Sequence, residues 1–250
     1  ARPGNDDFAN AAVLAGPYFG IEGLNADATM EPSEPAHAGV ASGASIWYAW
    51  TAPRSGSYGL DTAGSDFDTL LAVYTGSAVG ALTQVAANDN DAALSPRSKV
   101  AFNATAGTTY RMAIAGKNGA TGMTVLNLTA PPPPNDNFVN AIVLAGDSVT
   151  VDGYTVGGTL ESGEPSKDGN AGGHSIWYTW TAPASGNVTI RTAGSAFDTL
   201  LGVYTGSAVN SLSLVEDNDD EQTNPTPIRT SLVTFNANSG TVTFDDANQL

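Results

Sequence analysis

The chain has 250 residues, with 25 acidic and 9 basic side chains, two histidines and no cysteine. Its formal net charge of -16 argues against nucleic acid or an anionic membrane surface as a partner, because both are polyanions. The lack of cysteine excludes disulfides, thiol catalysis and cysteine-bound zinc, and no apolar run reaches the ~20 residues of a membrane-spanning helix. With 41% hydrophobic residues, the chain has the composition of a folded protein.

The sequence contains an internal repeat, with two copies of one unit. The motif Asn-Asp-x-Phe-x-Asn-Ala at residue 5 recurs at residue 135, and this offset of 130 holds without a gap as far as Asp89 and Asp219. Between the copies lie four consecutive prolines, 131–134, which form a stiff polyproline spacer. We therefore predict two domains, 1–130 and 135–250, joined by a linker at 131–134.

Each copy has the pattern of a series of short strands. They are rich in β-branched and aromatic residues and are separated by Gly, Pro, Asn and Asp. In the first copy we expect strands at 45–51, 69–74, 98–102, 110–114 and 122–128. The segment 8–14 and its twin 138–144 fit either a single helical turn or a strand. Many short strands in so short a length predict an all-β fold, with two tandem antiparallel β-sandwiches of jelly-roll type.

The two copies differ at their ends. In the second copy, residues 241–244 can stand for the strand at 110–114, but nothing corresponds to the strand at 122–128. An antiparallel domain without its last strand exposes unpaired backbone groups, which tend to pair with another chain. Two interpretations stay open: the chain is a cut piece, or a neighbouring subunit supplies the strand.

Several motifs occur in the same order in both copies. They are Asn-Asp-x-Phe-x-Asn-Ala, Glu-x-x-Glu-Pro, Ser-Ile-Trp-Tyr-x-Trp-Thr-Ala-Pro and Phe-Asp-Thr-Leu-Leu-x-Val-Tyr-Thr-Gly. In this combination the chain resembles the bacterial pre-peptidase C-terminal (PPC) domain family. The resemblance implies secreted, non-catalytic jelly-roll domains, which accompany secreted peptidases or repeat in large surface proteins. Some relatives bind calcium or a polymeric substrate.

The resemblance leads us to expect an extracellular or cell-surface location. The first residues, Ala1 to Asp6, are not a signal peptide, as expected of a mature secreted chain or of a trimmed one. No catalytic domain accompanies the two copies, which favours a structural or adhesive role over an accessory role to an enzyme.

Acidic and amide side chains recur at two places in each copy, and the first is a candidate calcium site. An aspartate before the strand at 69–74 is followed about 20 residues later by an Asn-Asp cluster, and a hairpin over 70–85 would bring the two together. Calcium prefers six to eight oxygen ligands, and carboxylates that meet repel one another unless a cation lies between them. The arrangement is similar to the calcium site of CUB domains. The expected ligands are Asp68, Asn88, Asp89 and Asp91 in the first copy, and Asp198, Asp217, Asn218 and Asp219 in the second.

The second place joins the N-terminal Asn-Asp pair of each copy to two later glutamates. These residues are Asn5, Asp6, Glu31 and Glu34, mirrored by Asn135, Asp136, Glu161 and Glu164. In some collagen-binding relatives, the N-terminal segment and a following acidic turn hold calcium. For both places the alternative stays open that these are ordinary turn residues or solvated acids.

Catalytic patterns are missing from the sequence. His37 and His174 do not occupy matching positions, and no His-Glu-x-x-His, Gly-x-Ser-x-Gly or phosphate-loop motif occurs. We therefore predict that the chain is not an enzyme. Trp47, Tyr48 and Trp50 lie on one expected strand, and such aromatic residues either fill a sandwich core or form a platform for sugars; the core is favoured.

The leading interpretation is a secreted, non-enzymatic structural or adhesive protein of tandem calcium-stabilised β-sandwich repeats. Its expected partners are copies of itself, joined by strand complementation at the incomplete second domain into a filament or surface layer, or an extracellular polymer. Neither nucleic acid binding nor membrane insertion is expected. Two alternatives remain: a module that anchors a secreted hydrolase to protein or polysaccharide, and a lectin-like sugar binder.

Overall fold

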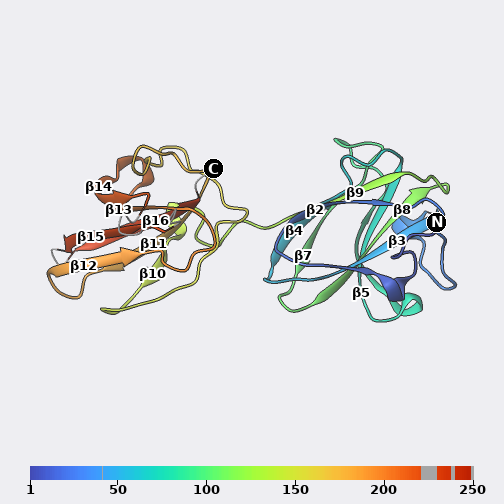
Figure 1. The fold of residues 1–250 in the computed structure, drawn as a ribbon, viewed down its shortest axis with the longest axis horizontal. Helices are drawn as coiled ribbons and strands as arrows, with labels where there is room; N and C mark the ends of the chain where they lie inside the picture. Colours follow the sequence, from blue (N-terminus) through green and yellow to red (C-terminus); the bar gives the residue numbers. More distant parts are fainter. Residues whose placement is uncertain (41, 221–229, 238–239, 249–250) are drawn as a thin grey trace. The chain divides into compact units, whose positions relative to one another are not determined.

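The computed structural model describes residues 1–40, 42–220, 230–237 and 240–248. The chain divides into two compact units, Ala1–Pro131 and Pro132–Leu250, and the boundary falls within the four prolines. Both units consist of strands and short 3-10 turns, drawn from blue to green in the first unit and from yellow to red in the second (Figure 1). In the described ranges, no helix is long and apolar enough to cross a membrane.

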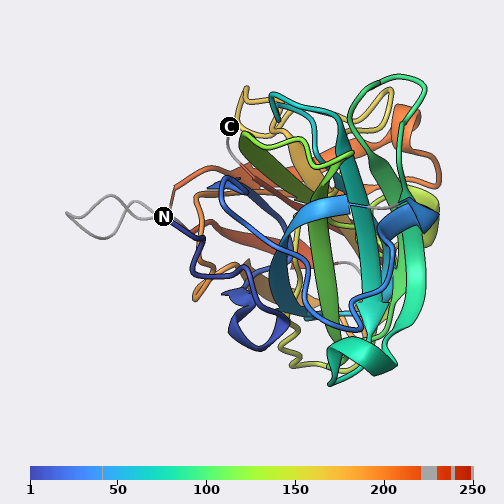
Figure 2. The same ribbon diagram turned by 90° about the vertical axis from the view of Figure 1, so that its right-hand side faces the viewer.

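The first unit is a sandwich of a five-stranded and a four-stranded sheet. The five-stranded sheet has the order β1 (Ala12–Leu14), β3 (Ser42–Thr51), β8 (Thr109–Lys117), β5 (Thr69–Thr75) and β6 (Thr83–Asn88). The four-stranded sheet has the order β2 (Phe19–Leu24), β9 (Met123–Thr129), β4 (Gly56–Asp61) and β7 (Lys99–Ala104). All neighbours are antiparallel except β1 and β3, which are parallel. In Figure 2, blue segments from the beginning of the first unit lie beside green segments from its end.

Strand β3 is buried on both of its faces. On the inner face, the Trp50 ring lies 4.9 Å from that of Tyr58 on the opposite sheet, and this contact packs the two layers together. On the outer face, Trp47 contacts Phe8 at 5.2 Å and Tyr74 at 5.9 Å between ring centroids. The N-terminal segment, with its 3-10 turn η1 (Phe8–Asn10), therefore covers the outer face of the sheet.

The second unit repeats the five-stranded sheet. Its order is β10 (Ile142–Leu144), β11 (His174–Thr181), β16 (Thr241–Asn248), β13 (Thr199–Thr205) and β14 (Ser213–Asn218). In the part of this unit that the structure describes, the second sheet consists of β12 (Gly186–Arg191) and β15 (Leu232–Ala237). Tyr178 and Trp180 of β11 form one core with Val233 and Phe235 of β15, so the two layers again face each other.

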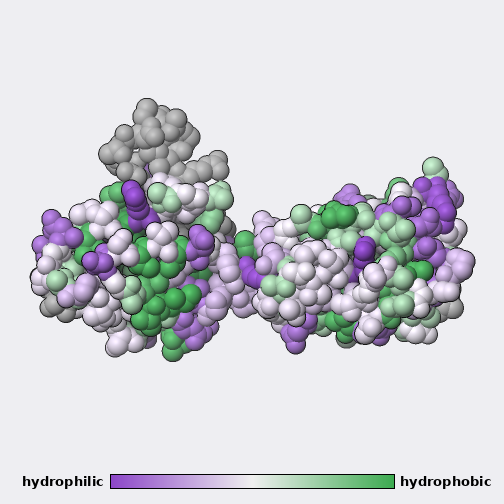
Figure 3. Space-filling model, turned by 90° about the horizontal axis from the view of Figure 1, so that it is seen from below, coloured by the Kyte–Doolittle hydropathy of each residue, from purple (hydrophilic) through white to green (hydrophobic). Residues whose placement is uncertain are grey.

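Within the described part of the second unit, β2 and β9 have no counterparts. In the first unit, Leu126 and Leu128 of β9 are buried in the core. In the second unit, Val149 and Val151 lie where β2 would be and are 46% and 43% exposed. Figure 3 shows hydrophobic side chains, in green, gathered on a face of this unit. Among the described residues, the second sandwich therefore has no strand paired with the edge of β12 that faces away from β15.

The strands expected from the sequence are confirmed, with small differences at their ends. The hairpin expected over 70–85 is the antiparallel pair β5 and β6. The ambiguous segment 8–14 contains both a helical turn and a strand, because the 3-10 turn η1 is followed after one residue by strand β1. In the second unit, β16 pairs with β11 and β13 as β8 pairs with β3 and β5, so residues 241–244 do replace the strand at 110–114. The remaining 3-10 turns are η2 (His37–Gly39), η3 (Val79–Ala81), η4 (Phe138–Asn140) and η5 (Val209–Ser211).

Candidate functional sites

The first candidate site of the first unit holds an internal cation. The pairing of β5 with β6 places Asp68, just before β5, near Asp89, just after β6. The ammonium of Lys117, at the end of β8, lies 2.6 Å from Asp89 Oδ2, and the Lys117 amide donates to the carbonyl of Asp68 at 3.0 Å. The hydrogen bond to Asp89 raises the pKa of Lys117 above its usual value. A lysine thus lies where the sequence predicts calcium.

The other expected ligands of this site serve the local turn. Asn88 Oδ1 accepts from the amide of Lys99 at 3.4 Å, and Asp91 Oδ1 accepts from the amide of Ala93 at 3.0 Å. The second contact is an Asx-turn, the ordinary use of aspartate in a loop. Asp68 and Asp89 are therefore the pair that this fold brings together.

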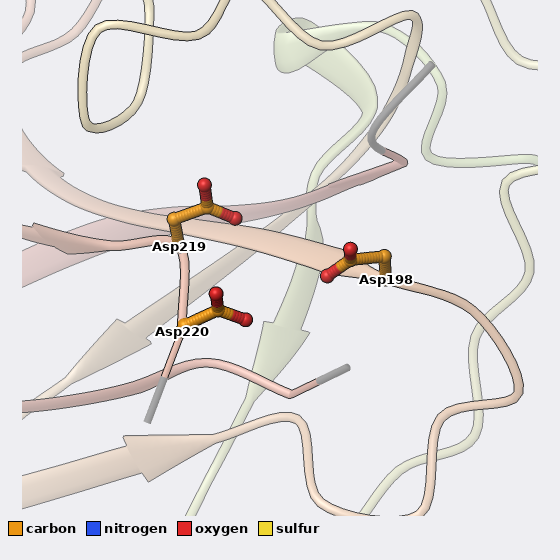
Figure 4. A group of neighbouring side chains, drawn as sticks. All are labelled: Asp198, Asp219 and Asp220. Atoms are coloured by element: carbon orange, nitrogen blue, oxygen red, sulfur yellow. The ribbon is translucent and has the colours of Figure 1, made fainter. Parts of the chain in front are cut away.

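The corresponding place in the second unit holds three carboxylates. Asp198, Asp219 and Asp220 each offer one oxygen, and these oxygens lie within 4.8 Å of one another (Figure 4). Asp198 Oδ1 is buried and makes no hydrogen bond to the described residues, and the same holds for Asp68 Oδ1 in the first unit. The register of β8 and β16 matches Lys117 with Gln249 in the sequence, a residue outside the described part of the chain. Three carboxylates this close repel one another, which is the setting that favours a bound calcium.

The other two expected ligands of the second unit bond to protein groups. Asp217 Oδ2 accepts from the amide of Asp168 at 2.7 Å. Asn218 Oδ1 accepts from the amide of Leu232 at 2.9 Å, and its amide donates to the carbonyl of Asp220 at 3.1 Å. The structure therefore brings Asp219 to Asp198 as expected, and adds Asp220 in place of Asp217 and Asn218.

The second candidate place clamps the N-terminal segment of each unit to the sheet. Each of its residues forms a hydrogen bond with the protein. In the first unit, Asn5 donates to the Trp47 carbonyl at 3.0 Å, Asp6 accepts from the Thr29 amide at 2.6 Å, Glu31 accepts from the Phe8 amide at 2.5 Å, and Glu34 accepts from the Glu31 amide at 2.8 Å. These bonds satisfy backbone groups that a buried loop would otherwise leave unpaired.

The second unit repeats this clamp. Asn135 donates to the Trp177 carbonyl at 2.9 Å, Asp136 accepts from the Thr159 amide at 2.6 Å, Glu161 accepts from the Phe138 amide, and Glu164 accepts from the Glu161 amide at 3.1 Å. The recurrence of these acids and amides thus has a structural explanation that needs no ion.

A buried polar network adjoins the clamp of the first unit. His37 Nε2 lies 2.9 Å from Glu34 Oε1, both side chains are fully buried, and His37 Nδ1 lies 2.8 Å from the Tyr74 hydroxyl. Burial alone would raise the pKa of Glu34, but hydrogen bonds from His37 and Ser45 outweigh it and hold that pKa below its usual value. Burial raises the pKa of Tyr74 to about 12. His37 is therefore a partnered core residue.

The second unit has a lysine where the first has His37. Lys167 Nζ lies 2.8 Å from Glu164 Oε1 and 2.5 Å from Asp245 Oδ2, and all three side chains are fully buried. The contact of Lys167 with Asp245 is not predicted from the sequence. The signal that could have found it is a paired change between the copies, since strand register places Asp245 opposite Trp177 as Ala113 is placed opposite Trp47.

The tryptophans of both units belong to the core, as the sequence favours. Trp47, Trp50 and Trp177 are fully buried, and Trp180 is 8% exposed. The strands that carry them therefore offer no aromatic platform to a sugar.

Comparisons with known proteins identify no family. No family model matches the chain, and no curated protein matches it. Among solved structures, the CUB1-EGF-CUB2 domains of rat MASP-1 are 10% identical, over 96% of this chain and 95% of that chain, with a TM-score of 0.28. A Paenibacillus sp. cycloisomaltooligosaccharide glucanotransferase is 14% identical, over 94% of this chain and 47% of that chain, also with a TM-score of 0.28. Likenesses of this strength carry no argument about function.

Proposed function

We propose that this chain is a secreted, non-enzymatic structural or adhesive protein, built from tandem β-sandwich units of which the second is stabilised by calcium. The observation that carries the calcium part is the contrast between the two copies. The first unit balances Asp68 and Asp89 with Lys117, whereas the second unit brings three carboxylates, those of Asp198, Asp219 and Asp220, within 4.8 Å of one another. The order of sequence motifs in both units supports a relationship to the PPC family and, with it, an extracellular location.

The charge at this place explains why a cation would matter. A carboxylate oxygen that is buried without a partner costs free energy, and neighbouring carboxylates add to that cost. A calcium ion would be bound by Asp198 from the start of β13 and by Asp219 and Asp220 from the end of β14, joining two strands of one sheet. At a free concentration ten times its Kd, the ion would add about 1.4 kcal/mol to the free energy of unfolding.

Calorimetric melting of the full chain, with calcium or with a chelator, tests this proposal. Calcium is expected to raise the melting temperature of the second unit and leave that of the first unchanged. Asp198→Asn should abolish the shift, and the matched variant Asp68→Asn should keep it. No heat on calcium titration and an unchanged melting curve would show that the cluster binds no calcium.

The incomplete second sandwich favours assembly as a second part of the proposed function. Strand β12 has a neighbour in β15 on one side, and the described residues supply none on the other. In the first unit, the same place beside β4 is filled by β9, whose Leu126 and Leu128 are buried. A strand from another molecule would pair with the backbone of β12 and cover apolar side chains, which are the two requirements of strand addition.

Supplying the missing strand in the same chain tests the assembly. One variant carries a flexible linker and a copy of residues 122–130 after Leu250, and its control has Asp in place of the leucines copied from Leu126 and Leu128. We expect the natural chain to form large species in sedimentation and in electron micrographs, the first variant to be monomeric, and the control to assemble like the natural chain. A natural chain that is monomeric at all concentrations would refute assembly through this edge.

A further inference from the structure

Lys167, Glu164 and Asp245 form a reactive combination of groups inside the second unit. The amine of Lys167 lies 2.5 Å from Asp245 Oδ2 and 2.8 Å from Glu164 Oε1. The carboxyl group of Glu164 is also close enough to that of Asp245 to raise its pKa. All three side chains are fully buried, so no bulk water reaches the amine or the carboxyl groups. The fold thus holds an amine and two carboxyl groups in contact, as an intramolecular reaction between them requires.

Both residues of this charged pair differ from the residues at the matching positions of the first unit. Where the second unit has Lys167 and Asp245, the first has His37 and Ala113. Both units keep the glutamate. A third change accompanies them, since Gly202 replaces Ala72, and a Cβ at Gly202 would clash with the hydroxyl and ring of Tyr204. The second unit has thus made room for an extra charged pair.

The free energy needed to bury this charged pair makes added stability a poor explanation for its presence. Burying an ion pair removes two charges from water, and this penalty commonly cancels the attraction between them. Hydrophobic residues of similar size would hold the core as well. The His37 arrangement of the first unit shows that the same sheet forms without the pair.

We propose that Lys167 and Asp245 react to form an intramolecular amide bond, with Glu164 carrying the proton. The neutral Lys167 amine attacks Cγ of the protonated Asp245 carboxyl group. A C–N bond forms, a C–O bond breaks, and one water molecule leaves. Glu164 accepts the proton from Nζ and gives a proton to the departing hydroxyl. The reaction is a condensation, so it needs no oxidant, reductant or activating group.

The surroundings favour the protonated Asp245 that the reaction needs. Burial lowers the pKa of Lys167, but Asp245 and Glu164 outweigh it and raise that pKa, so the Lys167 ammonium must first give up a proton to become the attacking amine. Burial raises the pKa of Asp245 well above its usual value, and the neighbouring Glu164 raises it further, against the opposing effect of Lys167. An uncharged acid beside an uncharged amine avoids the penalty of buried charges. Glu164 keeps its place through further hydrogen bonds, from the Glu161 amide at 3.1 Å and the Ser175 hydroxyl at 3.0 Å. Exclusion of water also opposes hydrolysis of the amide once it has formed.

The intact mass of the purified full chain is the first test. We expect a mass lower than that of the sequence by one water molecule, and the full mass for Lys167→Arg and Asp245→Ala. Asp245→Asn should still condense, now with loss of ammonia, and keeps the size of the side chain if Asp245→Ala fails to fold. Glu164→Gln should fold but leave the amine and acid unjoined.

A tryptic digest of the denatured chain places the bond. Cleavage should fail after Lys167, and the peptide 118–191 should appear joined to 230–250 in fragment spectra. Ring closure at Asp168-Gly169 would also release water, but it would leave those two peptides separate and would persist in Lys167→Arg. That result, or an unmodified mass with normal cleavage after Lys167, would overturn the proposal.

Discussion

Removing the lysine from the buried cluster should destabilise the second unit severely. In Lys167→Met no amide bond can form, and two carboxyl groups that lie 2.8 and 2.5 Å from Nζ in the unreacted cluster remain buried without it. Loss of one partner from a buried charged set costs about 3–5 kcal/mol at neutral pH. For a unit of this size, such a loss corresponds to a fall of about 10–20 °C in melting temperature.

The loss of stability in Lys167→Met should depend on pH, and its direction follows from the protonation of Asp245. Without Lys167, the folded unit must keep Asp245 protonated, so its pKa in the folded state lies above the value in the unfolded state. The folded unit then binds more protons than the unfolded chain, and its stability falls as the pH rises through that window. We expect the loss to be largest near neutral pH and to shrink below about pH 4, where the unfolded acids are protonated as well.

Calorimetry of the full chain between pH 4 and 8 measures this effect, with the transition of the first unit as internal control. The matched variant Lys167→His with Asp245→Ala rebuilds the arrangement of His37 and Ala113. At pH 7 it should recover the stability lost to the stranded acids, but not the stability that the amide bond itself contributes. Equal melting curves for Lys167→Met and this double variant at pH 7 would refute the argument that stranded buried acids cause the loss.

Two further predictions use the duplication as a control. Tyr74→Phe should destabilise the first unit by about 1 kcal/mol, because the hydroxyl bonds to buried His37; Tyr204→Phe should have little effect, since its hydroxyl makes no hydrogen bond to the described residues, and urea unfolding of both variants checks the difference. Lys117→Met should make the first unit respond to calcium, because Asp68 and Asp89 then lack their cation; melting with calcium and with a chelator should now show a shift, and an unchanged curve would count against the equivalence of the two sites.

The strands and the duplication could be predicted from the sequence because their signals are local. The alternation of apolar residues along β3 and the turn residues between β5 and β6 are each contained within a few positions. The repeat also needs no structure to be seen. The one ambiguity, at 8–14, arose because a 3-10 turn and a three-residue strand share a stretch too short to show a period.

The charged sites could not be predicted to the same extent because their members are distant in sequence. Lys117 reaches Asp89 from a strand on the far side of β5, and Asp245 reaches Lys167 only through the pairing of β16 with β11. The sequence alone therefore indicates metal ligands at positions where several of the acidic side chains accept hydrogen bonds from backbone amides instead. Comparison of the two copies, position by position, is the sequence evidence that would have revealed the exchanged partners.

The clamp at the start of each unit also sets how mechanical force enters the second unit. Asn135 follows directly after the four prolines, and its side chain donates to the carbonyl of Trp177 in the middle of the buried strand. Tension along the stiff proline segment would thus reach Asn135 and Asp136 before any other described contact of the unit. These side chains anchor the segment that leads into β10, which lies parallel to the buried strand β11. A protein that holds a surface under load would gain from this attachment.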